Sequence, residues 1–250
     1  MKTILITGCS SGFGLETART FLAREWNVIA TMRRPADVLP RAEHLRVLPL
    51  DVTDERSIRS LVESAGPIDA LVNNAGVGLM GVFEGTPMET IRGIFETNTF
   101  GAMALTQAFL PQLRLRRGVV VNVSSSTTLK SLPMLSVYTA SKAALNAFTE
   151  SLALELEAVG VRARLVLPGQ APETPFAQNA QALVRQQGVA TPDAYADFAR
   201  RTFEERVKVR GGACTRSLSV AEAVWRAVND PSCPLRQAAG ADAVEWARSA

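Results

Sequence analysis

The sequence has 250 residues, of which 47% are hydrophobic, and a formal net charge of +3 from 27 basic and 24 acidic side chains. A chain of this length buries enough apolar surface to fold without metals or disulfides. Its three cysteines and single histidine match no metal-site or disulfide spacing. Clustered basic residues that would mark a nucleic-acid site are missing, and no apolar run reaches the ~18 residues of a membrane span. We therefore expect a cytoplasmic globular protein that binds no metal, nucleic acid or membrane, with a first strand starting almost at Met1 and no leader before it.

Short apolar runs alternate with longer amphipathic stretches along most of the chain. The runs are continuous in Val, Ile and Leu, as strands covered on both faces must be. They predict strands at Thr3–Thr7, Asn27–Thr31, Leu45–Leu50, Ala70–Asn73, Val119–Ser124 and Arg162–Leu167. Helices are predicted at Phe13–Arg24, Asp54–Ser64, Met88–Leu115 and Tyr138–Val159. This alternation predicts an α/β protein, with a doubly wound parallel sheet of about seven strands and helices on both faces.

The pattern changes at about residues 171–215, which are polar and predict one or two helices, such as Thr191–Val209, without a strand. An insertion here often forms a lid over a ligand cleft; the alternative is a surface pair of helices that touches no ligand. A helix at Val220–Val228, a strand at Arg236–Gly240 and a helix at Ala241–Ala247 are then expected. No repeat or linker divides the chain, so residues 1–250 are predicted to form a single domain.

A glycine-rich loop, Thr7–Gly14, joins the first strand to the first helix. Gly8 permits a tight exit from the strand, Gly12 lets backbone amides approach a pyrophosphate, and Gly14 lets the helix pack against the sheet. The helix N-terminus adds free amides for the phosphates. The loop predicts a Rossmann-type dinucleotide site, although a tight turn without a ligand would use glycines in the same way.

The residues after the second strand bear on the choice of cofactor. NAD sites place an acidic residue there for the ribose 2′-hydroxyl, whereas an arginine accommodates a 2′-phosphate. Here Thr31 is followed by Met32, Arg33 and Arg34. This favours NADP(H) over NAD(H), unless the two arginines are only solvated loop residues.

Tyr138 and Lys142 are four residues apart in a predicted helix and so share one face. A nearby ammonium lowers the pKa of a phenol from its usual value of about 10, and such a phenol can exchange a proton with an alcohol or alkoxide. Ser125 lies thirteen residues before Tyr138, at the end of a strand, where open α/β sheets bind ligands. A shift of one residue in register would bring Ser124 or Ser126 there instead.

Together these motifs resemble the short-chain dehydrogenase/reductase family, and the resemblance covers nearly the whole chain. The motifs that carry it are Thr7–Gly14, Asn73-Asn74-Ala75-Gly76, Asn98, Ser125, Tyr138 with Lys142, and Pro168-Gly169. The resemblance implies that Tyr138 is the general acid–base, that Lys142 lowers its pKa and holds the nicotinamide ribose, and that Ser125 polarises the carbonyl. It also implies that Asn98 links the lysine to solvent through a water.

The resemblance further implies a set of cofactor contacts. Asp51-Val52 would flank the adenine, Asn74-Ala75-Gly76 the adenosine ribose, and Ser11 and Arg33 the 2′-phosphate. In the alternative, Asn73 and Asn74 only satisfy buried backbone. The full set of predicted cofactor-binding residues is Gly8, Ser10, Ser11, Gly12, Phe13, Gly14, Arg33, Asp51, Val52, Asn74, Ala75, Gly76, Tyr138, Lys142, Pro168, Gly169 and Thr174.

One feature departs from the family pattern. The family places three residues between Pro-Gly and a threonine, whereas here four residues, Gln170–Glu173, precede Thr174. The contact of Thr174 with the nicotinamide carboxamide is therefore left open. In motif style, Thr31-Met32-Arg33 is closest to NADP-preferring carbonyl reductases and to hydroxysteroid and retinol dehydrogenases.

The expected reaction is hydride transfer between NADP(H) and a hydrophobic ketone or secondary alcohol, in which Tyr138 moves the proton and Ser125 stabilises the oxyanion. A cofactor-binding sensor without turnover, and an epimerase or dehydratase that retains its cofactor, are the alternatives. Apolar residues proposed for the pocket wall, or else for the core, are Leu79, Met80, Leu132, Met134, Leu135 and Phe176. The resemblance also implies a homodimer or homotetramer that packs through the helices Met88–Leu115 and Tyr138–Val159.

Overall fold

A parallel sheet forms the centre of the molecule. The computed structural model describes residues 1–209 and 213–249, and seven strands in them are hydrogen-bonded in the order β3-β2-β1-β4-β5-β6-β7. The chain moves outward from β1 to β3 and then crosses back to β4, and ligands bind beside such a reversal at the carboxyl ends of the strands. The strands are β1 (Thr3–Ile6), β2 (Asn27–Met32), β3 (Leu45–Pro49), β4 (Ala70–Asn73), β5 (Val119–Val123), β6 (Arg162–Pro168) and β7 (Arg236–Ala239). The predicted doubly wound α/β fold is confirmed.

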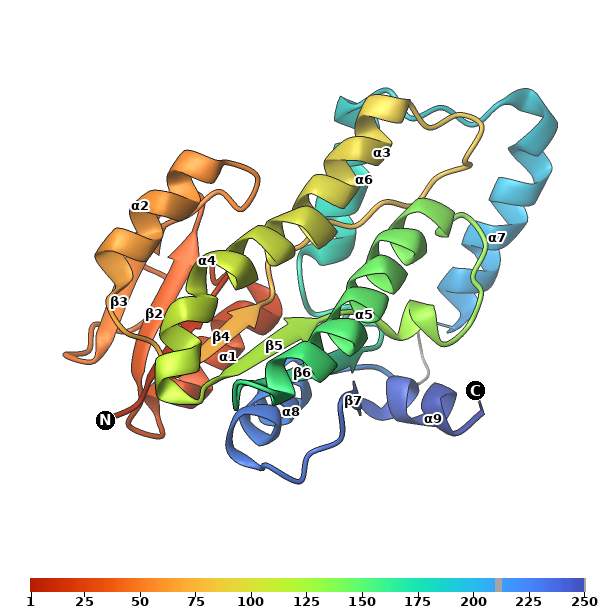
Figure 1. Cartoon of the computed structure of the whole chain (residues 1–250). Coiled ribbons are helices and arrows are strands. Elements are labelled where there is room, and N and C mark those ends of the chain that lie inside the picture. The colour runs from red at the N-terminus through yellow and green to blue at the C-terminus, as the bar shows by residue number, and fades with distance from the viewer. Residues whose placement is uncertain (210–212, 250) are drawn as a thin grey trace.

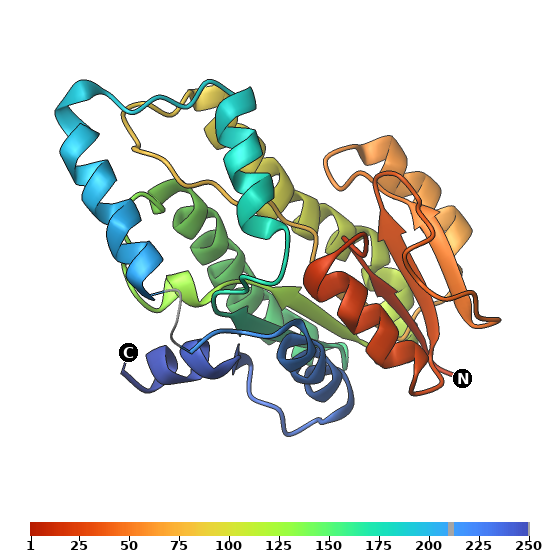
Figure 2. The ribbon, with the colours of Figure 1, turned by 180° about the vertical axis from the view of Figure 1, so that it is seen from behind.

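Helices cover both faces of the sheet (Figures 1 and 2). On one face α1 (Gly12–Leu22) and α8 (Ser217–Asn229) pack together in an apolar cluster that includes Phe21 and Val224. On the other face α2 (Glu55–Ala65), α4 (Gly101–Arg116) and α5 (Ser136–Glu157) share a cluster that includes Phe109 and Leu152. All residues of β4 and β5 are buried between these layers, which explains why both strands are apolar apart from Asn73 and Asn122.

The insertion at residues 171–215 stands beyond the edge of the sheet, where Figure 1 shows it beside the start of α5. It carries α6 (Phe176–Gln186) and α7 (Ala196–Val209), which is preceded by a 3₁₀ turn, η3 (Asp193–Tyr195). Both helices pack back onto the body of the molecule. Leu183 of α6 joins the apolar cluster of Ile94 and Val137, and Ala199 of α7 packs with Val82 and Met134. After the insertion, α8 and β7 lead to a last helix, α9 (Ala241–Ser249).

The predicted helix Met88–Leu115 is interrupted in the structure. It consists of α3 (Met88–Phe95), a π-helical turn η1 (Glu96–Phe100), and α4. The turn holds Asn98, whose side chain makes two hydrogen bonds to the backbone of Val77. Apolar periodicity carries no signal of this turn, because the groups that bind Asn98 come from a distant part of the chain.

Among residues 1–209 and 213–249, no helix combines the length and the apolar character needed to cross a membrane.

Candidate active site

The glycine loop lies between the ends of β1 and β4, and its glycines are required by close backbone contacts. Gly8 has φ of +73°, a region that favours glycine. A Cβ on Gly14 would lie 2.4 Å from the carbonyl oxygen of Gly8. The N-cap of α1, Ser11, makes no side-chain capping hydrogen bond. The first amides of α1 therefore have no side-chain cap, as a phosphate-binding helix N-terminus requires.

The segment that follows β4 is tied to this loop through Thr7. The Thr7 hydroxyl oxygen accepts hydrogen bonds from the backbone N–H of Asn74 at 3.0 Å and of Ala75 at 2.9 Å. The Asn74 side chain donates to the Thr7 carbonyl at 2.8 Å. Asn73 instead turns into the core, where its amide donates to Asn122 and Thr106. The Asn74 side chain thus satisfies backbone carbonyls of the glycine loop, as the alternative interpretation expects, whereas Asn73 bonds mainly to other side chains.

A cavity of about 410 Å³ opens beside the glycine loop and is lined by Ser10, Met32, Arg33, Arg34 and Asp51. Burial raises the pKa of the Asp51 carboxyl, but hydrogen bonds from Thr53 and the charge of Arg33 outweigh it and hold the pKa below its usual value. One carboxylate and two guanidinium groups therefore border a space at the carboxyl end of β2. Of the predicted cofactor-binding residues, Ser10, Arg33 and Asp51 line this cavity.

Ser125 and Tyr138 form a hydrogen-bonded pair of hydroxyl groups at the end of β5. Both are buried, with exposed fractions of 7% and 8%. Ser124 points elsewhere, since its hydroxyl donates to the carbonyl of Lys142 at 3.4 Å. The register inferred from the sequence is therefore the one that brings Ser125, and not its neighbour, to Tyr138.

The pKa of Tyr138 moves in the direction opposite to the one that the sequence predicts. Burial raises it to about 12, and the hydrogen bond with Ser125 only partly offsets this. Lys142 Nζ donates to the Val123 carbonyl at 2.9 Å, and burial lowers the pKa of Lys142 to about 8. Desolvation disfavours both charged forms, so the phenol is protonated near neutral pH and can act as a proton donor.

Asn98 and Lys142 converge on Gly76. A Cβ on that glycine would lie 3.2 Å from Asn98 Oδ1 and 3.4 Å from Lys142 Nζ. The Asn98 side chain accepts from Val77 N–H at 2.8 Å and donates to the Ser141 hydroxyl at 3.0 Å. The π-helical turn thus brings Asn98 to α5, and such turns are frequent at functional sites.

Thr127 is a residue of this site that sequence reasoning missed. Its backbone N–H and its hydroxyl both donate to Ser125 Oγ, at 3.2 and 3.0 Å. Ser125 is the N-cap of a 3₁₀ turn, η2 (Ser126–Thr128), which places Thr127 there. Because the Ser125 oxygen accepts both of these hydrogen bonds, its own proton is directed toward Tyr138. No residue spacing in the sequence signals this contact.

The insertion lies against both the glycine loop and Tyr138. The Phe176 ring makes an edge contact with the Tyr138 ring, with centroids 5.9 Å apart. A Cβ on Gly12 would lie 3.3 Å from Thr174 Cγ2, so the longer loop still brings Thr174 to the glycine loop. The Thr174 hydroxyl itself donates within its loop, to the Ala171 carbonyl at 2.9 Å.

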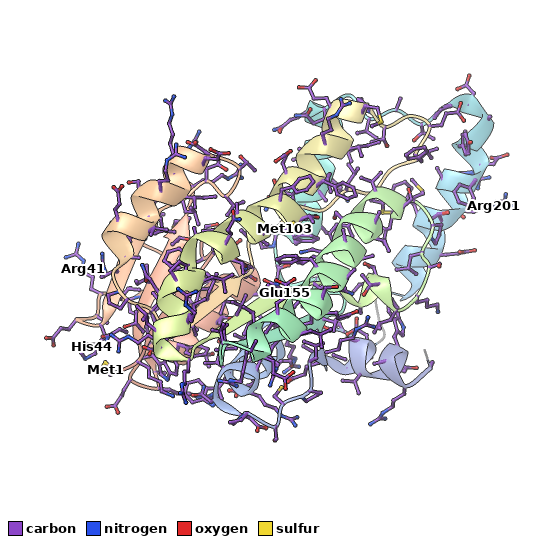
Figure 3. The ribbon with its side chains drawn as sticks, in the orientation of Figure 1. Met1, Arg41, His44, Met103, Glu155 and Arg201 are labelled. Carbon is purple, nitrogen blue, oxygen red and sulfur yellow. The ribbon has the colours of Figure 1, made fainter. Side chains whose placement is uncertain are left out.

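The other residues predicted for the pocket wall divide between two places. Leu79 belongs to the apolar cluster of Ile94 and Val137, while Met80 and Met134 pack near α7. Leu135 is buried and Leu132 half-buried. The chain's only histidine, His44, is exposed at the rim beside β3, away from α5 (Figure 3).

A family model described as short chain dehydrogenase matches residues 2–184. The chain belongs to this family. It is 45% identical over 185 residues to the uncharacterized oxidoreductase YusZ of Bacillus subtilis, a match that covers 67% of this chain and 64% of that protein. It is 40% identical over 181 residues to human retinol dehydrogenase 8, covering 67% and 58%. The matched region is thus less than two thirds of the length of these relatives.

Solved structures agree with this membership over nearly the full chain. A short-chain dehydrogenase from Streptomyces avermitilis superimposes with a TM-score of 0.82 at 33% identity, covering 99% of this chain and 91% of that one. A Burkholderia cenocepacia short chain dehydrogenase in complex with NADP has a TM-score of 0.79 at 25% identity, covering 100% and 94%. A Burkholderia phymatum relative in complex with NAD has a TM-score of 0.80 at 25% identity, covering 94% and 88%. The chain therefore has the fold as well as the sequence of the short-chain dehydrogenase family, and the two Burkholderia structures contain NADP and NAD, respectively.

Proposed function

We propose that this protein is an oxidoreductase, namely an NADP(H)-dependent carbonyl reductase or alcohol dehydrogenase that acts on a hydrophobic ketone or secondary alcohol. The observation that carries the proposal is the buried hydroxyl pair of Ser125 and Tyr138, with Lys142 one helical turn behind. The nicotinamide supplies or accepts the hydride. We further propose that residues 1–250 form one catalytic domain and that residues 171–215 are its substrate lid.

In this mechanism the protein positions the carbonyl oxygen and provides the proton. Ser125 Oγ, directed by Thr127, donates a hydrogen bond to the substrate oxygen and stabilises the charge that develops there. Tyr138, protonated because burial raises its pKa to about 12, donates its proton to the alkoxide oxygen. In the reverse direction the same phenol must first lose its proton. Alcohol oxidation should therefore speed up with rising pH, while ketone reduction should not.

The preference for NADP(H) is supported by the cavity beside β2. Arg33 and Arg34 line it together with Ser10, and guanidinium groups bind phosphate with paired hydrogen bonds. Both arginines are exposed, so a 2′-phosphate can reach them without disturbing the core. The α1 N-terminus, Asp51, the Asn74–Gly76 segment and Thr174 would hold the rest of the cofactor.

The hydrophobic nature of the substrate is supported by the surroundings of Tyr138. Phe176 covers the tyrosine ring, and the apolar residues Val82 and Met134 pack beneath α7. A lid of this kind excludes water from the reacting groups. The name of a relative, retinol dehydrogenase 8, refers to an apolar alcohol, in line with this class of substrate.

A homodimer or homotetramer in the cytoplasm is also proposed. It is supported by large apolar side chains exposed on the outer helices, namely Phe100, Leu115 of α4 and Leu154 of α5, with exposed fractions of 50%, 84% and 74%. Figure 3 shows the face that bears α4 and α5, marked by Met103 and Glu155. Burial of such side chains between subunits would remove apolar surface from water.

The test of the reaction is turnover of NADPH and NADH with aliphatic, aryl and steroid ketones, with a Tyr138→Phe variant alongside. The variant keeps the ring and loses the proton, so kcat/KM should fall by roughly 10²–10⁴-fold. Tyr195→Phe, at the chain's only other tyrosine, is the matched control and should retain activity. Tight NADPH binding without turnover would instead favour a sensor, and cofactor that survives purification without exchange would favour an epimerase or dehydratase.

The test of cofactor preference is Arg33→Ser. Loss of a phosphate contact should weaken NADPH binding by about tenfold and leave NADH binding unchanged. Arg41→Ser removes an exposed arginine of the same loop that does not line this cavity and should leave the affinity for both cofactors unaltered. A wild-type preference for NADH would overturn the role proposed for Arg33.

A further inference from the structure

The two ends of the insertion meet in a buried polar cluster at the foot of the lid. Gln170 precedes the insertion and Thr215 ends it, and the Thr215 N–H donates to the Gln170 carbonyl at 2.7 Å. The Asp242 carboxylate, from the first turn of α9, accepts the Gln170 N–H at 2.6 Å and the Thr215 hydroxyl at 2.6 Å. Thr215 is fully buried and Asp242 is 7% exposed. One carboxylate thus contacts both ends of the insertion.

The carboxylate also lies against the backbone of the loop that follows β6. A Cβ on Gly169 would lie 2.1 and 2.2 Å from the two Asp242 oxygens. The Gly169 N–H donates to the Thr215 hydroxyl oxygen at 3.0 Å. Gly240, with φ of +102°, has the Thr215 hydroxyl only 1.9 Å from where its Cβ would be. Glycine is therefore required at both positions by the side chains of Thr215 and Asp242.

A second contact joins the same two ends farther out. The Glu173 carboxylate accepts the backbone N–H of Ser217 at 2.6 Å, at the start of α8, where Arg216 provides no side-chain cap. Glu173 immediately precedes Thr174, which lies against Gly12. The position of Thr174 at the cofactor loop therefore depends on how the ends of the insertion are held.

The charge of Asp242 is compensated by hydrogen-bond donors. In the described part of the chain it takes part in no ion pair. The two donors and the N-terminus of α9, where a negative charge is favoured, stabilise it. A well-packed apolar side chain is often at least as stabilising as a buried charged group, so stability alone does not account for a carboxylate at this position.

We propose that Asp242 is a positioning residue, which acts through Thr215 and the Gln170 N–H to hold the Pro168-Gly169-Gln170 loop and both ends of the lid against the cofactor site. This inference rests on the proposed function, because the loop and Thr174 would contact the nicotinamide half of NADP(H). The adenosine half binds at the opposite end of the site, beside Arg33, where Asp242 makes no contact. Loss of Asp242 should therefore weaken one half of the site and spare the other.

The experiment compares the binding of NADPH with that of 2′,5′-ADP, which has only the adenosine half, by calorimetry. Asp242→Ala leaves the Gln170 N–H and the Thr215 hydroxyl without their partner and should weaken NADPH binding about tenfold, with 2′,5′-ADP affinity within about twofold of the wild type. Asp242→Asn is the conservative variant. The asparagine amide can accept the Gln170 N–H through its oxygen and donate to the Thr215 hydroxyl oxygen through its nitrogen. The Thr215 hydroxyl can then donate its own proton to the Ala239 carbonyl, 3.0 Å away. The NADPH affinity of this variant should therefore stay within about threefold of the wild type.

Thr215→Val and Thr215→Ser form a second pair in case Asp242→Ala does not fold. The valine should behave like Asp242→Ala, and the serine, which keeps the hydroxyl, like the wild type. Limited proteolysis without cofactor gives an independent readout, since Asp242→Ala should be cut faster within residues 171–215 while the sheet stays resistant.

The outcomes separate this inference from the proposed function. A wild-type protein that binds neither ligand overturns the proposed function, and the role of Asp242 with it. If the wild type binds both ligands, unchanged NADPH binding in Asp242→Ala overturns the role of Asp242 alone. Equal losses of affinity for NADPH and 2′,5′-ADP in Asp242→Ala also overturn the role of Asp242, because they indicate a general loss of structure. An unchanged rate of cleavage within residues 171–215 overturns it as well, because it shows that Asp242 does not hold the ends of the insertion.

Discussion

Lys142 is buried, and its positive charge should lower the free energy of unfolding even though the proposed reaction requires it. Its exposed fraction is 4%, and burial lowers its pKa from 10.5 to about 8. The native state therefore holds this proton less tightly than the unfolded chain does. At pH values below both pKa values, this difference corresponds to about 3 kcal/mol in favour of unfolding.

Replacement of Lys142 by methionine keeps the length of the side chain and removes its charge. The variant loses the hydrogen bond to the Val123 carbonyl, which costs about 1–2 kcal/mol. The net expectation is that Lys142→Met unfolds with a free energy about 1–2 kcal/mol higher than the wild type at about pH 7. The same change should abolish turnover, a trade-off that is common at active sites.

The sign of the pH dependence follows from the same pKa. Between about pH 8 and 10.5 the native protein has released the Lys142 proton and the unfolded chain still binds it, so the stability of the wild type rises with pH relative to that of Lys142→Met. The advantage of the variant should shrink across this range. Tyr138 is present in both proteins and cancels from the difference.

Urea unfolding of both proteins at fixed concentration, at about pH 7 and about pH 10, measures this difference directly. Lys130→Met is the matched control. Lys130 is exposed and lies over the Trp246 ring, and its loss should cost less than about 1 kcal/mol. A Lys142→Met variant that is less stable than the wild type at about pH 7, or whose advantage does not change with pH, would refute the reasoning.

Three further predictions concern the hydroxyl pair, the lid and the outer helices. Thr127→Val should lower kcat/KM about three- to tenfold, because Ser125 loses a donor, while Thr127→Ser should restore it; equal rates in the two variants would contradict this. Phe176→Ala should expose Tyr138 and lower its pKa from about 12 toward 10, seen as an earlier rise in phenolate absorbance during alkaline titration; an unchanged midpoint would show that the ring does not shield it. Leu154→Arg should reduce the mass measured by light scattering if α5 lies in a subunit interface, and an unaltered oligomer would exclude that face.

Much of the fold and part of the site could be predicted because the signals are local. Strands β4 and β5 are short runs that are apolar apart from one asparagine each, and most helices begin and end within a few residues of the positions that periodicity predicts. Tyr138 and Lys142 share a helix, and Ser125 precedes them by a short connection, so their spacing alone places them together. The same is true of the Thr7–Gly14 loop, whose glycines occupy a single turn.

Other features depend on groups that are far apart in the sequence. The Asn98 side chain, in the π-helical turn, makes two hydrogen bonds to the backbone of Val77. No residue pattern near Asn98 predicts this turn. A hydrogen bond joins the Gln170 N–H to the Asp242 carboxylate, which lies 72 residues farther along the chain. Neither could be predicted from spacing, because the partners meet only when the chain folds. Asn98 meets the segment that follows β4, and Gln170 meets Asp242 once β6 and β7 lie side by side.

The sequence by itself determined the order of the elements and the glycine loop, because these follow from periodicity and short spacings. It predicted the roles of Ser125, Tyr138 and Lys142 through the resemblance of its motifs to a known family. Only the tertiary structure decided their protonation. The sequence pairs a phenol with an ammonium and predicts a lowered tyrosine pKa, whereas the folded chain buries both groups and raises it to about 12. The reason is physical: a pKa depends on how much water and which charges surround a group, and those surroundings are assembled from distant segments.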